Sequence, residues 1–239
     1  MSPLEFKKAY LNISVPIICA TDIVGKRINP RVAIKEYRNR SINFKASAKN
    51  KLISFMRRNH YPRSDRTAVA RAFNGKANLA ECKRALRAIW HSGHAGINLQ
   101  NYCKANLGID CSGFVNNYFL REYGMRKTSI PGYYQNGRAN VRTNFNEFEA
   151  EDVLIWCHPS GRLKTKGHGR HIAIIDSVQE DYAGNELRAT VVESTGKLGL
   201  IDSVYTFIKT SRSDVYEVNR PKKPSPRKNY VRVVPVVSC

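Results

Sequence analysis

With 239 residues, 42% of them hydrophobic, the chain is long enough for one ordinary domain with an appendage or for two small domains. Its 40 Lys and Arg against 19 Asp and Glu give a net charge of +21, which favours negatively charged partners: nucleic acid, anionic membranes or the acidic polymers of a bacterial envelope. The composition excludes wholesale disorder, and no apolar run approaches the roughly 18 residues of a membrane-spanning helix.

The first 76 residues predict a basic, mainly helical region. An apolar run at 13–24 is interrupted by polar residues and lacks a clean cleavage site, so it predicts a strand or buried loop and not a signal peptide. Residues 31–58 are rich in basic helix formers and predict two short helices with a break near 39–41. A further short helix is expected to end at Gly75.

Two stronger helices follow. The first begins near Asn78, has one apolar and one basic face, and ends at the glycines that follow His91. The second is predicted from Cys111 to Tyr123, because its apolar residues recur at helical spacing and Gly124 supplies a stop.

The second half of the chain changes to the period of strands. Short β-branched and aromatic runs bounded by turn residues predict strands at 153–156, 171–175, 189–194 and 204–209. A hairpin turn is expected at Ala183–Asn185. The basic, Pro-rich segment 220–229 predicts a solvated linker to an edge strand near Pro235. Helices followed by an antiparallel sheet predict an α+β fold, with a domain at 77–219 and a tail at 220–239.

One cysteine is in a chemically distinctive position. Cys111 begins a predicted helix, where backbone N–H groups and the helix dipole stabilise a thiolate. The small residues Ser112 and Gly113 follow it and let a substrate approach, and a backbone N–H at such a turn can hold the oxygen of an attacked carbonyl. A buried, inert cysteine is the alternative interpretation of this position.

A base and an orienting group are available on the predicted strands. His171 opens a strand, which would hold it more rigidly than the glycine loop holds His168. Glu193 interrupts an apolar strand, and a carboxylate facing the interior of a sheet needs a partner such as His171. The alternatives are a half-buried structural histidine and a glutamate on the solvent face.

Three segments together resemble the NlpC/P60 and CHAP cysteine peptidases and amidases. Asp110–Val115, DCSGFV, looks like the DCSG(L/F)V signature of the NlpC/P60 family. Glu151–Trp156 resembles its GDLVFF-like strand, and His171–Ile175 resembles its HVGIY-like strand. The order of these elements matches, and the resemblance covers roughly residues 78–210.

The resemblance implies a papain-like domain in which the nucleophile helix packs on an antiparallel sheet. It implies that Cys111 is the nucleophile, His171 the general base and Glu193 the third, orienting residue, a choice nearer to the CHAP amidases. The substrate-binding residues that it implies are Tyr102, Asp110 and Ser112, the latter two for the free amine of a stem peptide. It implies neither a metal nor a cofactor.

The expected activity is therefore cleavage of an amide bond in peptidoglycan, in the periplasm, the envelope or outside the cell. Because no signal peptide is predicted, delivery by a dedicated system or in phage lysis is expected, and otherwise a cytoplasmic location. Alternatives are a papain-fold toxin, deamidase or acyltransferase, and a basic nucleic-acid-binding protein without a recognised motif. A zinc site is a further alternative, with the ligands Cys82, His91, His94 and Cys103.

Overall fold

The computed structural model describes residues 1–18, 27–39, 45–96, 98–165, 169–179, 186–222 and 228–236. His168, the predicted hairpin turn at Ala183–Asn185, and half of the predicted linker at 220–229 lie outside these residues. No helix in the described ranges is long and apolar enough to cross a membrane.

The chain forms two compact units. One, called here the barrel unit, comprises Met1–Phe6, Val115–Glu193 and Ile201–Cys239. The other, called here the helical unit, comprises Lys7–Phe114 and Ser194–Leu200. These units differ from the predicted segments 1–76, 77–219 and 220–239, because each unit gathers residues that are distant in sequence.

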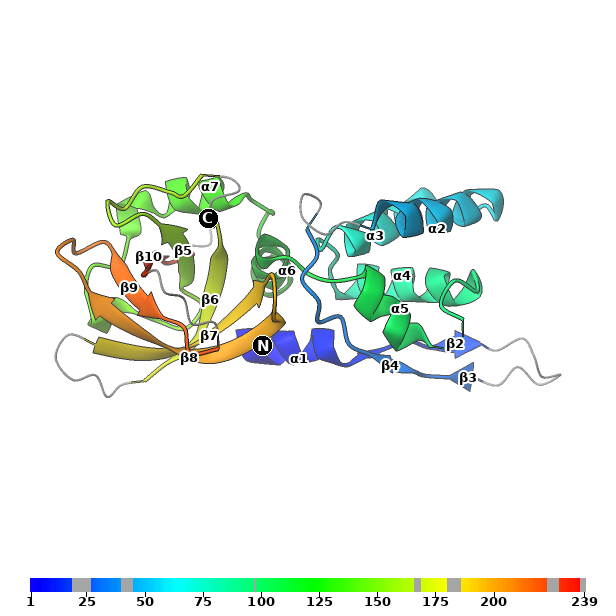
Figure 1. The fold of residues 1–239 in the computed structure, drawn as a ribbon, viewed down its shortest axis with the longest axis horizontal. Helices are drawn as coiled ribbons and strands as arrows, with labels where there is room; N and C mark the ends of the chain where they lie inside the picture. The colour runs from blue at the N-terminus through cyan, green and yellow to red at the C-terminus, as the bar shows by residue number, and fades with distance from the viewer. Residues whose placement is uncertain are drawn as a thin grey trace. The chain divides into compact units, whose positions relative to one another are not determined.

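The helical unit holds most of the N-terminal helices (Figure 1). Its described elements are α2 (Ala46–Arg58), α3 (Arg63–Phe73), α4 (Leu79–His91), α5 (Leu99–Asn106), part of α1 (Pro3–Leu11), and the short strands β1 (Ile13–Ser14), β2 (Ile17–Ile18), β3 (Arg27–Ile28) and β4 (Arg31–Val32). The strands pair as β1 with β4 and β2 with β3.

The predicted helix starts and stops are largely confirmed in this unit. Asn78 caps α4, since its side chain accepts from the backbone N–H of Glu81 at 2.9 Å and the Glu81 carboxylate accepts from the Asn78 N–H. Gly75 follows the end of α3 with φ +72°. The expectation of two helices at 31–58 is not met in the described part of this range: residues 31–39 contain β4 and irregular backbone, and in 45–58 the helix is α2. Helix-forming residues there are overridden by tertiary pairing.

The barrel unit is built on a closed antiparallel barrel with the strand order β10-β5-β6-β7-β8-β9 (Figure 1). The strands are β5 (Val153–Cys157), β6 (Ile172–Val178), β7 (Glu186–Thr195), β8 (Gly199–Lys209), β9 (Tyr216–Asn219) and β10 (Asn229–Val234). The helices are most of α6 (Cys111–Tyr123), α7 (Ile130–Asn136), and the short helices η1 (Arg138–Asn140) and η2 (Phe145–Glu147). The α+β fold class and the predicted bounds of α6 are confirmed.

Two predictions about the sheet are corrected. The last strand is not an edge strand, because β10 pairs with β5 on one side and β9 on the other. It is therefore part of the barrel and not of a separate tail, and Val231 and Val233 are buried in the barrel core with Trp156. A buried apolar face on β10 favours closure, since closing the sheet satisfies the backbone groups of both edges.

Candidate active site

Cys111 is the first residue of α6, and Asp110 fixes where that helix starts. The Asp110 Oδ1 accepts a hydrogen bond of 2.5 Å from the backbone N–H of Gly113, which is the geometry of a helix N-cap. The side chain of Cys111 is buried, with 5% of the residue exposed. The predicted position of a cysteine at a helix start is thus confirmed.

Two glycines let neighbouring segments approach the loop before Cys111. The backbone N–H of Ile109 donates to Glu36 O at 2.9 Å, and a Cβ on Gly108 would meet that same oxygen at 2.1 Å. The backbone N–H of Asp110 donates to Gly75 O at 2.9 Å. The loop is therefore held by Glu36 and Gly75, which lie at least 35 positions earlier in the chain, in segments without a recognisable motif.

A tyrosine lies near the cysteine, and it is not the predicted one. The Tyr37 phenol is near enough to Cys111 and Asn39 for both side chains to shift its pKa. Burial raises the pKa of Tyr37, and the neighbouring Cys111 and Asp110 raise it further, so the phenol keeps its proton at neutral pH. The sequence carries no local signal for this contact, because Tyr37 lies 74 residues before the cysteine.

The predicted tyrosine, Tyr102, lies in α5. Its hydroxyl is buried and has no hydrogen-bond partner within the described ranges. Burial, and then the neighbouring Cys103, raise its pKa to about 12. The structure thus gives Tyr102 a different neighbourhood from Cys111, and its predicted role in the active site has no contact to support it.

The two residues expected to bind a substrate amine already hold an amine of the chain. The Lys76 Nζ lies 2.7 Å from Asp110 Oδ2 and 2.6 Å from Ser112 Oγ. Burial raises the pKa of Asp110, whereas the ammonium of Lys76 opposes that shift and stabilises the carboxylate. Asp110 and Ser112 are brought together as predicted, but around Lys76.

The predicted histidine and glutamate are in direct contact in the barrel unit. His171 immediately precedes β6, and its backbone oxygen accepts from the Trp156 N–H of β5 at 3.1 Å. Its Nε2 donates to Glu193 Oε2 at 2.6 Å. Glu193 follows Val192, which pairs with Ile174 of β6, so the strand register brings the carboxylate to the imidazole. Glu193 is 1% exposed, which excludes the solvent-face alternative.

Glu193 is the centre of a buried polar cluster. Tyr205 donates to its Oε1 at 2.6 Å, and Arg220 donates to its Oε2. Burial by itself would raise the pKa of Glu193, but the hydrogen bonds and charges of His171 and Arg220 lower it well below the ordinary 4.5. The carboxylate therefore stays ionised, and an ionised carboxylate is an acceptor for the N–H of an imidazole ring.

Arg220 also fixes the surroundings of the histidine. Its guanidinium lies 5.0 Å from the centre of the Trp156 ring, and its Nε donates to the Tyr205 hydroxyl at 2.9 Å. The Trp156 ring in turn contacts the His171 ring edge-to-face, with centres 4.5 Å apart. The prediction that residue 220 begins a solvated linker is wrong, because Arg220 is buried against Glu193.

The predicted residues thus form two clusters: Cys111, Asp110 and Ser112 in the helical unit, and His171 and Glu193 in the barrel unit. The first can support a nucleophilic thiol at a helix start, and the second an imidazole oriented by a carboxylate. The alternative zinc site is not supported. Within the described ranges no group of three His, Cys, Asp or Glu side chains could hold a metal ion, and the Cys82 thiol donates to a backbone oxygen.

Comparison of the chain with protein-family models, with curated proteins and with solved structures finds no match.

Proposed function

We propose that the chain is a cysteine hydrolase that cleaves an amide bond in bacterial peptidoglycan. Cys111 is the nucleophile, His171 the general base and acid, and Glu193 the residue that orients the imidazole. The observation that carries the proposal is the buried Glu193–His171 hydrogen bond of 2.6 Å. Support also comes from the thiol at a capped helix start and from the resemblance of the three motifs to the NlpC/P60 family.

The Glu193 contact supports a role for one of the two ring nitrogens of His171. Since Nε2 donates to Glu193, Nδ1 is the atom that accepts the proton of the Cys111 thiol. The thiolate attacks the amide carbonyl carbon, and backbone N–H groups at the helix start hold the oxyanion. His171 then protonates the leaving amine as the C–N bond breaks. Water, deprotonated by His171, hydrolyses the thioester and releases the acid.

A role for Tyr37 follows from its position near Cys111. A protonated phenol that donates to Cys111 stabilises the thiolate form of the nucleophile and holds it in one rotamer. Tyr37 is therefore a positioning residue for Cys111, and it replaces Tyr102 in the proposed site.

Purified sacculi test the activity. Wild-type protein should release muropeptides, and mass spectrometry of the products identifies the bond that is cleaved. Cys111→Ala and His171→Ala should each lose release by at least about 1000-fold, as expected for residues that act in the chemical step. Cys103→Ala removes another buried cysteine of the helical unit and should keep wild-type release. If Cys111→Ala and wild type release equal amounts, the proposal fails.

Alkylation of Cys111 tests whether the thiol and the imidazole act together. The rate of iodoacetamide labelling of the Cys111 peptide at pH 6 should fall at least tenfold in His171→Ala, because a neighbouring imidazolium stabilises the thiolate. Labelling of the Cys111 peptide in Cys103→Ala, which keeps both proposed catalytic residues, is the control. Equal Cys111 labelling in the two proteins would refute the pairing of Cys111 with His171. A labelled thiol without peptidoglycan cleavage would instead indicate another acyl substrate.

A further inference from the structure

The positive charge of the chain is concentrated in the helical unit. Residues 7–114 and 194–200 contain 22 Lys and Arg and 5 Asp and Glu, a net charge of +17, whereas the rest of the chain contains 18 and 14, a net of +4. Of the acidic side chains in the helical unit, Asp65, Glu81 and Asp110 are paired with basic residues of the same unit. This unit is therefore the part of the chain that attracts polyanions.

One helix carries this charge in an ordered stripe. Ser47, Lys51, Ser54 and Arg58 follow one another at intervals of four, three and four residues, so they lie on one face of α2. At about 1.5 Å per residue the stripe is about 16 Å long, with cations and hydroxyls in alternation. No Asp or Glu occurs between Tyr37 and Ser64. A linear ligand with repeated negative charges matches this pattern.

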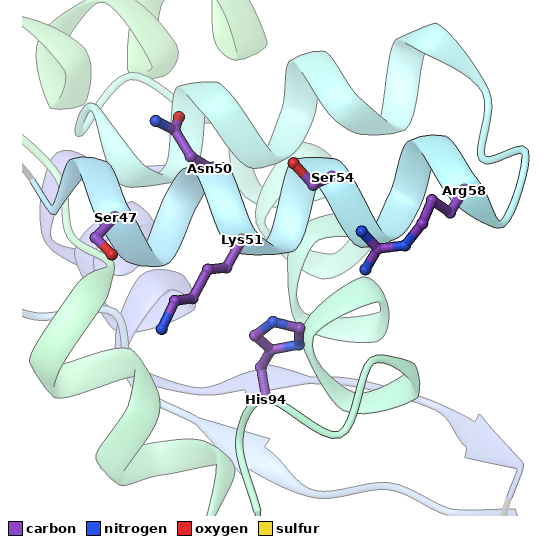
Figure 2. A pocket seen from close by; sticks show the side chains of 6 residues that line it. All are labelled: Ser47, Asn50, Lys51, Ser54, Arg58 and His94. Atoms are coloured by element: carbon purple, nitrogen blue, oxygen red, sulfur yellow. The ribbon is translucent and has the colours of Figure 1, made fainter.

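The stripe residues are exposed to solvent, and they border a shallow, open pocket. A pocket of about 480 Å³ is lined by the four stripe residues together with Asn50 and His94. Figure 2 shows Lys51 and Arg58 extending from α2 toward the side on which His94 lies. Hydroxyl, amide and imidazole groups beside two cations are the side chains that bind phosphate oxygens.

A second pocket of about 470 Å³ continues the first, because both share Ser47, Lys51 and His94. It adds Lys45 and Tyr102 to the lining. The raised pKa of Tyr102 keeps its hydroxyl protonated, and this buried hydroxyl lacks an acceptor among the described residues. The binding surface thus extends along α2 toward Tyr102, whose hydroxyl lies beneath the surface.

The dimensions and the lining narrow the class of ligand. The stripe is about 16 Å long and one side chain wide, so a single extended chain can contact all four of its side chains. Single-stranded nucleic acids are usually bound by stacking their bases on exposed aromatic rings. Among the described residues of the helical unit, no Phe, Tyr or Trp ring is fully exposed, and Phe55, Tyr61 and Trp90 are half-buried.

We propose that the α2 groove, lined by Ser47, Lys51, Ser54, Arg58 and His94, binds a linear phosphodiester polymer of the bacterial envelope, of the polyol-phosphate kind. The choice of an envelope polymer rests on the proposed function, whereas the presence of an anion-binding groove does not. The groove would retain the enzyme on an anionic wall while a separate site hydrolyses the amide bond.

The full-length protein can be tested with an end-labelled poly(glycerol phosphate) of about ten repeats, by fluorescence anisotropy between about 50 and 200 mM salt. This polymer has no amide bond, so binding is measured independently of hydrolysis. The variant is Lys51→Gln/Arg58→Gln. The matched control is Lys83→Gln/Arg87→Gln, which removes two exposed charges from α4 of the same unit.

We expect the α2 variant to bind about tenfold more weakly at about 100 mM salt. The slope of the logarithm of its binding constant against the logarithm of the salt concentration should be smaller by about 1.4, which is about 0.7 for each of the two lost phosphate contacts. The control should change affinity less than about threefold. Three results would overturn the proposal: no binding by wild type at about 100 mM salt, equal weakening by the control, or tighter binding of an oligothymidylate with the same number of phosphates. Loss of polymer binding with intact muropeptide release would leave the proposed function standing.

Discussion

The buried ion pair between Glu193 and Arg220 makes a quantitative prediction. Their side chains are 1% and 6% exposed, so Glu193→Gln leaves the Arg220 guanidinium buried without a counterion. Breaking such a pair costs about 3–5 kcal/mol of the free energy of unfolding. In a chain of this size that loss lowers Tm by about 6–20 °C.

A double variant separates the charge imbalance from other effects of the substitution. Glu193→Gln/Arg220→Met removes both charges, so it should regain most of the stability that Glu193→Gln loses. Muropeptide release should not recover, because His171 still lacks its carboxylate partner. Stability and activity are thereby attributed to different contacts of the same side chain.

The pH dependence of the stability difference has a definite sign. The pKa of Glu193 is lowered on folding, so its stabilising contribution is complete above its ordinary value of 4.5 and is lost as the pH falls below it. The stabilities of wild type and Glu193→Gln, measured by denaturant unfolding, should therefore differ by less at about pH 4 than at about pH 8. A double variant as unstable as Glu193→Gln, or a difference that grows in acid, would refute the reasoning.

Three further predictions concern the residues around Cys111. Tyr37→Phe should slow alkylation of Cys111 at pH 7 by about 2- to 10-fold, since one hydrogen bond to the thiolate is lost; an unchanged rate would exclude the contact. The Lys76 ammonium is paired with Asp110, so that carboxylate is not free to bind the amine of a stem peptide. The kcat/KM of wild type should therefore be at least as high for a stem peptide with an acylated amine as for one with a free amine. In Lys76→Met the free-amine peptide should have the higher kcat/KM. Gly75→Ala should cost about 3 kcal/mol or more, because its Cβ would lie 2.0 Å from a backbone oxygen at φ +72°. The control Gly93→Ala, at φ +70° with no atom within 4 Å, should cost about 1 kcal/mol; equal losses in the two variants would show that crowding is not the cause.

The sequence by itself determined the elements whose signals are local. The helix Cys111–Tyr123 has the predicted bounds because its apolar spacing and its stop at Gly124 lie within the segment. The Asn78 cap of α4 is similarly local. The strands that carry His171 and Glu193 were recognisable from β-branched runs, and the need of a buried carboxylate for a partner indicated their contact.

Only the tertiary structure decided the contacts that join distant positions. Lys76 reaches Asp110 over 34 residues, and Arg220 reaches Glu193 over 27. Basic residues are common in this chain, so no local pattern distinguishes these two from the others, and Arg220 was expected in a solvated linker. The barrel likewise closes because β10 pairs with β5 across more than 70 residues. These contacts form because buried polar groups need a partner in the folded chain. Which groups are buried together depends on the packing of the whole chain and not on any one segment.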